Sequence, residues 1–219
     1  DVIGIYPILE DNTCYFLCAD FDDKNSEHGY QSDVQTFVSV CRDWGLTLSV
    51  ERSRSGNGAH IWMFFEEAIP CSIARKLGFA ILTEATNRNG HISFKSYDRF
   101  FPNQNVLPEG GLGNLVALPL QGQARKQGNS LFVDDDFTPY PNQWEYLQNI
   151  LKISSTQINT ILGTHLTKDL GELATSTDAL GNVTSYTQSY STSGNNTTYT
   201  ETVTNPDNST QITTSINGQ

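Results

Sequence analysis

The chain has 219 residues, enough for one sizeable domain or for one domain with an appendage. Its net charge of −11 argues against a protein that coats nucleic acid through a generally basic surface, although a local basic groove is compatible with it. The sequence contains no signal peptide and no apolar run long enough to span a membrane, and its 4 cysteines lack zinc-binding spacing. We therefore predict a cytoplasmic protein with no membrane partner and with free, buried thiols at Cys14, Cys18 and Cys41.

The apolar patterns predict alternating strands and helices along most of the chain. Strands are predicted over residues 2–9, 14–20, 46–50, 59–65, 92–97, 115–120 and 130–133. Helices are predicted from Ser32 or Asp33 to Gly45, after Pro70, and over residues 141–153 and 158–166. This order indicates an α/β (α+β) domain with a mixed or antiparallel sheet and flanking helices on one face.

Two different compositions are joined in this chain. All 13 Lys and Arg residues lie at or before Lys168, and Thr, Ser, Asn and Gly dominate the residues after it. We predict a folded domain over residues 1–168 and a tail over residues 169–219 that forms either β-hairpins or a disordered segment. Because the sequence opens at Asp1 without an initiator methionine, we expect the domain to be truncated at its N-terminus.

Two carboxylates end the strand predicted over residues 14–20. Asp20 and Asp22 are two residues apart, so in a strand both project from the same face. Like charges at the end of a buried strand repel each other unless a divalent cation with hard oxygen ligands, Mg²⁺ or Mn²⁺, neutralises them. The alternative is a solvated, Asp-rich loop.

A polar, Gly-rich loop is predicted over residues 51–58, ahead of the next strand, and the run that carries its chemistry is Arg52-Ser-Arg-Ser-Gly-Asn-Gly-Ala-His60. Its glycines allow backbone N–H groups to approach an anion closely, and Arg52, Arg54 and His60 add positive or hydrogen-bonding groups. Polyphosphate is the ligand that such a loop would bind. The alternative is a hairpin connection whose arginines face solvent.

Two further polar features lie later in the chain. Asp98 comes after another short apolar stretch, where a single acid is more often a cap or a turn residue. A second basic loop contains Arg125 and Lys126 and suits a positioning contact with a triphosphate or a template backbone. The alternative for this loop is a solvated hairpin tip.

Carboxylates, an anion-binding loop and a histidine are together the components of metal-dependent nucleotidyl transfer. In their order, Asp20-Phe-Asp22, Ser55-Gly-Asn-Gly-Ala-His60 and Asp98 resemble the three motifs of the archaeo-eukaryotic primase superfamily. The resemblance narrows to the primase-polymerase domain of TOTE conflict-system proteins and CRISPR-associated primase-polymerases, and it covers about residues 2–152. The segments that carry it are Gly4-Ile-Tyr-Pro7, Glu51-Arg-Ser-Arg-Ser-Gly-Asn-Gly-Ala-His60, Ser96-Tyr-Asp-Arg-Phe-Phe-Pro-Asn-Gln104 and Leu118-Pro-Leu-Gln-Gly122.

The resemblance implies an RRM-like catalytic sheet and template-directed synthesis of primers or DNA from NTPs or dNTPs. Its partners would be a nucleic-acid template, a primer and nucleoside triphosphates, and the helicase or nuclease domain usual in the family is absent from this chain. By the same resemblance, Asp20, Asp22 and Asp98 would bind two divalent cations, and His60 would contact the phosphates of the incoming nucleotide. The residues expected to shape the loop are Ser55, Asn57 and Gly58, the last standing where many members have Ser.

Two other functions fit parts of the sequence. One is an inactive nucleic-acid or nucleotide-binding module of a mobile-element or defence protein, which would need no metal. The other is a surface or secreted repeat protein, suggested only by the tail, and the unpaired cysteines and missing signal argue against it.

Overall fold

The fold is that of a computed structural model. It describes residues 2–22, 29–89, 96–108, 110–165, 172–177, 183–193, 196–204 and 209–216. The chain divides into two compact units, Asp1–Ile161 and Leu162–Gln219.

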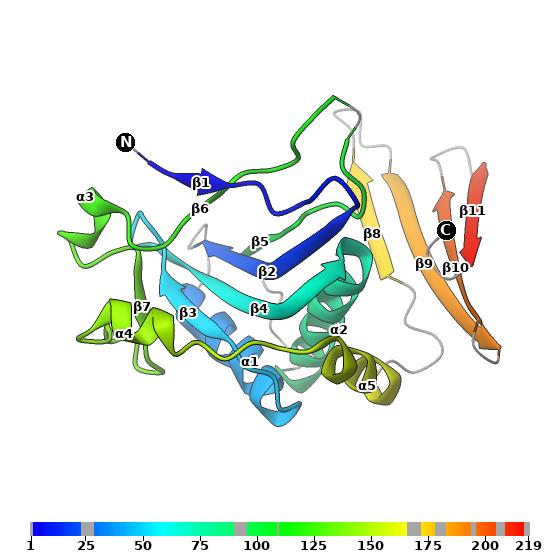
Figure 1. Cartoon of the computed structure of the whole chain (residues 1–219). Helices are drawn as coiled ribbons and strands as arrows, with labels where there is room; N and C mark the ends of the chain where they lie inside the picture. Colours follow the sequence, from blue (N-terminus) through cyan, green and yellow to red (C-terminus); the bar gives the residue numbers. More distant parts are fainter. Residues whose placement is uncertain are drawn as a thin grey trace. The chain divides into compact units, whose positions relative to one another are not determined.

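The first unit holds a sheet, a short strand pair and most of the helices (Figure 1). Its strands are β1 (Gly4–Ile5), β2 (Thr13–Asp22), β3 (Ser49–Arg52), β4 (Gly58–Pro70), β5 (Tyr97–Phe101), β6 (Val116–Ala117) and β7 (Leu131–Val133). The helices are α1 (Gly29–Asp43), α2 (Cys71–Asn89), α3 (Gly122–Arg125), α4 (Gln143–Gln148) and α5 (Ser155–His165), the last crossing the boundary between the units.

Five strands form one sheet in the order β5-β2-β4-β3-β7, and every pairing in it is antiparallel. Along the chain, β2-α1-β3-β4-α2-β5 gives the split β-α-β arrangement of an RRM-like fold. The predicted α+β class with an antiparallel, RRM-like sheet is therefore confirmed. β1 and β6 form a separate antiparallel pair.

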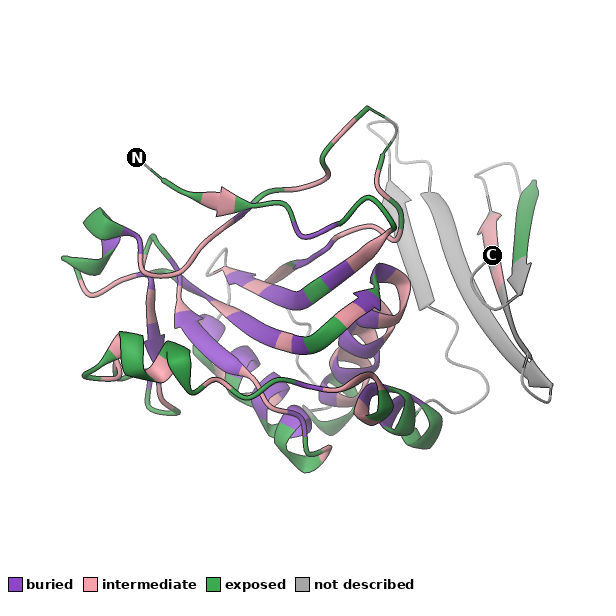
Figure 2. Ribbon diagram, viewed as in Figure 1, coloured by how far each residue is buried: buried purple, intermediate pink, exposed green. Residues whose placement is uncertain are grey.

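The main core lies between this sheet and helices α1 and α2, which cover the same face (Figure 1). Alternate residues of β2 point toward the helices, and the Phe21 ring packs edge-on against Phe37 of α1 at 5.8 Å between centroids. Figure 2 shows buried residues along the central strands and the inner sides of both helices. Helices α1 and α2 therefore cover one face of the sheet. The alternate side chains of the strands project from the opposite face.

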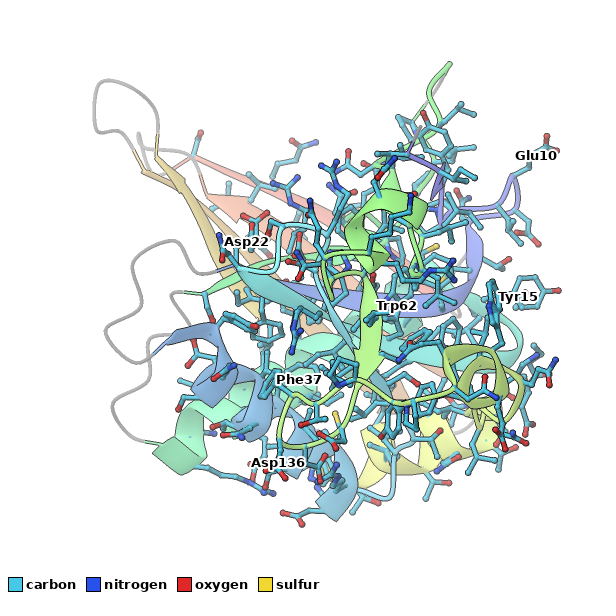
Figure 3. All side chains as sticks on the ribbon, turned by 90° about the vertical axis from the view of Figure 1, so that its left-hand side faces the viewer. Glu10, Tyr15, Asp22, Phe37, Trp62 and Asp136 are labelled. Atoms are coloured by element: carbon cyan, nitrogen blue, oxygen red, sulfur yellow. The ribbon has the colours of Figure 1, made fainter. Side chains whose placement is uncertain are left out.

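We call the other side of the sheet the open face. An apolar cluster covers part of it, formed by Phe16, Cys18, Trp62, Phe101, Val116 and Phe132. Figure 3 labels Trp62 of this cluster and Asp22, the last residue of β2. Because Asp20 and Asp22 continue the alternation of Phe16 and Cys18, they project from the open face just beyond the apolar cluster. All four cysteines are buried and free, which confirms the prediction for Cys14, Cys18 and Cys41 and adds Cys71.

Helix α1 ends where the sequence predicted but begins earlier. Gly45 has φ +70°, and the hydrogen bonds from Gly45 N to Arg42 O (2.9 Å) and from Leu46 N to Cys41 O (2.8 Å) form a Schellman motif. The predicted start at Ser32 or Asp33 is wrong, because α1 begins at Gly29. Asp33 is instead buried inside the helix, where its carboxylate accepts a hydrogen bond from Ser96 Oγ at 2.5 Å.

Several predicted boundaries also need correction. The strand expected over residues 46–50 is β3, displaced to Ser49–Arg52, so Glu51 belongs to a strand and not to the Gly-rich loop. The helix expected over residues 141–153 shrinks to Gln143–Gln148, because the chain then turns to pair Ile153 with Phe65 of β4. Most of the strand expected over residues 92–97 lies outside the described residues, and β5 begins at Tyr97.

The described part of the second unit forms four antiparallel strands in sequential order. They are β8 (Glu172–Thr177), β9 (Val183–Ser193), β10 (Asn196–Thr204) and β11 (Thr210–Ile216). Such a meander needs only short connections between neighbouring strands. Across the residues that the structure describes, no helix combines the length and apolar composition that a membrane span requires.

Candidate metal and nucleotide site

Three carboxylates converge at one end of the central strands. Asp20 and Asp22 come from β2, and Asp98 comes from the neighbouring β5. The pairing of these strands shifts register between Asp20↔Arg99 and Phe21↔Tyr97, so Asp98 is the extra residue of a bulge. One ligand oxygen from each acid lies within 4.8 Å of the others, and all three residues are partly exposed. The bulge thereby brings a third acid beside the pair.

This group of oxygens suits a hard divalent cation. Three partly buried carboxylates so close together repel one another, and a bound cation would remove that repulsion. Carboxylate oxygen is the donor that Mg²⁺ and Mn²⁺ favour, whereas a zinc site would draw on thiolate or several imidazole ligands. The residues present therefore fit Mg²⁺ or Mn²⁺.

His60 lies directly beside the acids, because it pairs with Asp20 across β4 and β2. Its Nε2 is 3.4 Å from Asp20 Oδ1, and its Nδ1 is 3.0 Å from Glu51 Oε2. Burial alone would lower the pKa of His60, but the hydrogen bonds to Asp20 and Glu51 outweigh it and raise that pKa to about 10. The imidazole of His60 thus lies between the carboxylates of Asp20 and Glu51.

Glu51 is a site residue that the sequence analysis did not identify. It is 1% exposed and pairs with His60 across β3 and β4. The sequence analysis assigned it to a polar loop, where a carboxylate needs no partner. A signal was present, since Glu51 comes directly after the strand-like pattern ending at Val50, and a carboxylate that continues a buried strand needs hydrogen-bond donors.

The Gly-rich loop connects β3 to β4 beside Asp22. Ser55 Oγ lies 3.0 Å from Ser53 Oγ and accepts a hydrogen bond from Asn57 N at 3.2 Å, which shapes the turn. Ser55 and Asn57 are exposed, so they can meet a ligand. At Gly58 a Cβ atom would lie 2.3 Å from the carbonyl oxygen of Phe21 and 3.0 Å from Asp22 Oδ1. Strand β4 can therefore pack this closely against β2 at residue 58 only because glycine has no side chain.

The predicted cationic residues differ in their surroundings: one is hydrogen-bonded to neighbouring loops, and three are exposed. The guanidinium of Arg52 donates to the carbonyl oxygens of Gly128 at 2.8 Å and Phe137 at 2.5 Å, so it ties two loops to β3. Arg54, Arg125 and Lys126 are exposed, with Arg125 Cζ 5.9 Å from the Trp144 ring. Among the described contacts, these three side chains are not joined to the carboxylates.

Arg99 is a second residue that the sequence analysis left without a role. Its Nε donates to Asp98 Oδ2 at 2.8 Å, and it pairs with Asp20 across the strands. This hydrogen bond and the charge of Asp98 raise the pKa of Arg99, with smaller contributions from Asp20 and Asp22. Arg99 is thus a cation in the electrostatic field of all three acids.

A cavity of about 310 Å³ opens beside Asp98, at the outer edge of β5. Its lining residues are Arg75, Phe79, Tyr97, Asp98, Arg99, Phe100 and Asn103. Of the three clustered acids, Asp98 lines this cavity, and Asp20 and Asp22 do not.

An RRM-like sheet with an acidic cluster at the end of its central strands is the arrangement of a protein that binds a divalent cation at the sheet. The comparison with known families is more specific, because residues 1–161 match the family described as the TOTE conflict system, Archaeo-Eukaryotic Primase domain. This match covers most of the 219 residues, and the chain belongs to that family. The resemblance predicted from the sequence is thereby confirmed. No curated protein matched the chain.

Proposed function

We propose that this chain is a primase-polymerase domain that catalyses metal-dependent, template-directed nucleotidyl transfer from NTPs or dNTPs. The observation that carries the proposal is the cluster of Asp20, Asp22 and Asp98, whose ligand oxygens lie within 4.8 Å of one another in a domain of the archaeo-eukaryotic primase family. Three convergent carboxylates are a costly arrangement for stability alone, and they are the usual anchor for metal ions that act on phosphoryl groups.

The three carboxylates would hold two Mg²⁺ or Mn²⁺ ions. When bound, such ions supply positive charge for activating a primer hydroxyl and for stabilising the departing pyrophosphate. The acids themselves fix the position of that charge, because Asp20 and Asp22 project from one rigid strand and Asp98 from its neighbour. Asp98 is additionally oriented by its hydrogen bond from Arg99.

His60 and the Gly-rich loop would bind the triphosphate. Nε2 of His60 faces the acidic cluster and would donate a hydrogen bond to a phosphate oxygen, and the exposed Ser55 and Asn57 would contact the same group. Gly58 keeps the backbone close to Asp22. Arg54, Arg125 and Lys126 are exposed cations that would hold the phosphates of the nucleotide, the template or the primer. Because the chain as a whole is negatively charged, contacts with the phosphates of nucleic acid would be confined to these exposed cations.

Primer synthesis and primer extension with Mn²⁺ or Mg²⁺ test this function. The wild type is expected to incorporate nucleotides on a template, and the double variant Asp20→Ala, Asp22→Ala is expected to lose incorporation while keeping its fold. The matched control is Asp136→Ala, an exposed acid that lies well away from Asp22 in Figure 3. A wild type that incorporates no nucleotide on any template, or one that binds nucleic acid equally with and without metal, contradicts the proposal.

A further inference from the structure

Glu51 is a buried carboxylate on the open face of the sheet, in β3, and β4 lies between it and the acidic cluster. Only 1% of the residue is exposed, and it lies opposite His60, which in turn lies opposite Asp20. A carboxylate removed from water is costly unless its oxygens accept several hydrogen bonds. The neighbouring Arg52 does not provide them, because its guanidinium donates to backbone carbonyls.

Both oxygens of Glu51 are engaged by side chains. Oε2 accepts a hydrogen bond from Trp62 Nε1 at 2.9 Å and lies 3.0 Å from His60 Nδ1. An ionised carboxylate can only accept, so Nδ1 of His60 must carry a hydrogen. With Nδ1 held in this way, the ring presents Nε2 to Asp20 Oδ1, at 3.4 Å. Glu51 therefore sets which nitrogen of His60 faces the acids.

The other oxygen of Glu51 holds the second basic loop. Ser130 Oγ donates to Glu51 Oε1 at 3.0 Å and accepts from Gln121 N at 3.2 Å, which closes the loop between Gln121 and Ser130. Ser130 has φ +54°, a conformation that is uncommon for residues other than glycine. Its backbone is held as well, since its carbonyl accepts from Leu120 N at 2.8 Å. Arg125 and Lys126 lie on this same loop.

We infer that Glu51 is a positioning residue for the proposed nucleotide site, and this inference rests on the function proposed above. Through its two oxygens it locks the imidazole of His60 and the loop of Arg125 and Lys126 into one arrangement facing the triphosphate. The partners of Glu51 favour this role over a purely structural one. Two of its three partners belong to His60 and to the loop that carries Arg125 and Lys126, and only Trp62 belongs to the apolar cluster.

The first experiment observes His60 directly, without any catalysis. Nitrogen-15 imidazole spectra of the metal-free protein contain signals from 4 histidines, and a His60→Gln variant assigns the one of interest. In the wild type we expect a slowly exchanging hydrogen on Nδ1 of His60, because a buried hydrogen bond protects it. In Glu51→Gln that hydrogen is expected to lose its protection and change frequency. If the wild type shows no such protected hydrogen, the inference is wrong, and this result does not depend on whether the variant folds.

The second experiment measures binding of ATP and of dATP, each with Mn²⁺, in a double-mutant cycle. Glu51→Gln is expected to weaken binding roughly tenfold to hundredfold, as for partners that orient a ligand histidine, and to weaken it much less in a His60→Gln background. The control is Ser49→Ala, which alters a buried hydroxyl on the same strand and face that is hydrogen-bonded by Tyr146. This control should leave binding unchanged.

The possible failures are separable. If Glu51→Gln weakens triphosphate binding equally in the wild-type and His60→Gln backgrounds, the positioning role is wrong. It is also wrong if Ser49→Ala weakens binding as much as Glu51→Gln does. A wild type that binds neither triphosphate would instead contradict the proposed function, whatever the spectra of His60 show.

Discussion

At the scale of single residues, the site depends on how closely β4 approaches the strand that carries Asp20 and Asp22. Gly58 makes this approach possible, since any Cβ there would meet the Phe21 carbonyl at 2.3 Å. The backbone of β2 and the Asp22 carboxylate occupy the space that a side chain at residue 58 would need. A side chain at residue 58 would push β2 and β4 apart at the metal-binding end.

The substitution Gly58→Ala should therefore destabilise the protein and weaken metal binding together. Overpacking against a backbone atom costs about 1–3 kcal/mol, which denaturant unfolding would detect. The matched control is Gly163→Ala in α5, where a Cβ has no atom within 4 Å and where alanine is expected to stabilise the helix by about 0.5–1 kcal/mol. If Gly58→Ala unfolds like the wild type and binds metal equally well, the close approach is not a constraint.

At the scale of elements, helix α1 is hydrogen-bonded to Ser96, the residue directly before β5. Buried Asp33 of α1 accepts a hydrogen bond from Ser96 Oγ, and the carbonyl of Ser96 accepts from Asp22 N at 2.7 Å. Ser96 thus joins the helix to the carboxylate strand two residues before Asp98. The alignment of the third acid depends on this junction as well as on the strand pairing.

Removing the Ser96 hydroxyl should affect both stability and the metal site. In Ser96→Ala the buried Asp33 loses a donor, which we expect to cost about 1–3 kcal/mol in the free energy of unfolding. Asp98 should also become less well positioned, so Mn²⁺ binding should weaken. The comparison is Thr36→Ala, which removes a partly buried hydroxyl on the same helix that donates a hydrogen bond to the carbonyl oxygen of Ser32. Equal behaviour of the two variants would show that the junction is not needed.

Much of this element order could be predicted from the sequence, for identifiable reasons. Apolar alternation located β2 and β4 closely, and the φ preference of glycine located the end of α1 at Gly45. Asp33 and Glu51 were misassigned, because a polar residue in one sequence is assumed to be exposed or to cap a helix. Their partners, Ser96 and Ser130, lie 63 and 79 residues away, and local patterns contain no such contact.

At the scale of the whole molecule, two units of different composition share one chain. The sheet, the carboxylates and the candidate cations of the site lie within residues 1–161, and the second unit is rich in Thr and Ser. The sequence predicted the three acids as separate candidates, and only the strand order and the bulge in β5 brought Asp98 to the other two. The resemblance to the primase family had already grouped Asp20, Asp22 and Asp98 as metal ligands, without any knowledge of the strand pairing.

We propose that residues 1–168 suffice for the function. A chain ending at Lys168 keeps all of α5, whose Ile158 and Ile161 are buried, and lacks the Thr-rich tail. It should fold, and its Mn²⁺-dependent affinity for ATP should equal that of the whole chain in the same titration. A truncated chain that folds but no longer binds ATP would assign the tail a part in the site.

The most direct test of the central claim is a titration of the purified protein with Mn²⁺ alone, followed by electron paramagnetic resonance. The wild type should bind Mn²⁺, and Asp98→Asn should weaken that binding roughly tenfold or more, because it removes one of three clustered carboxylates. The same substitution at the exposed Asp136 should change nothing. An Asp98→Asn variant that binds Mn²⁺ as tightly as the wild type would contradict a metal centre shared between β2 and β5.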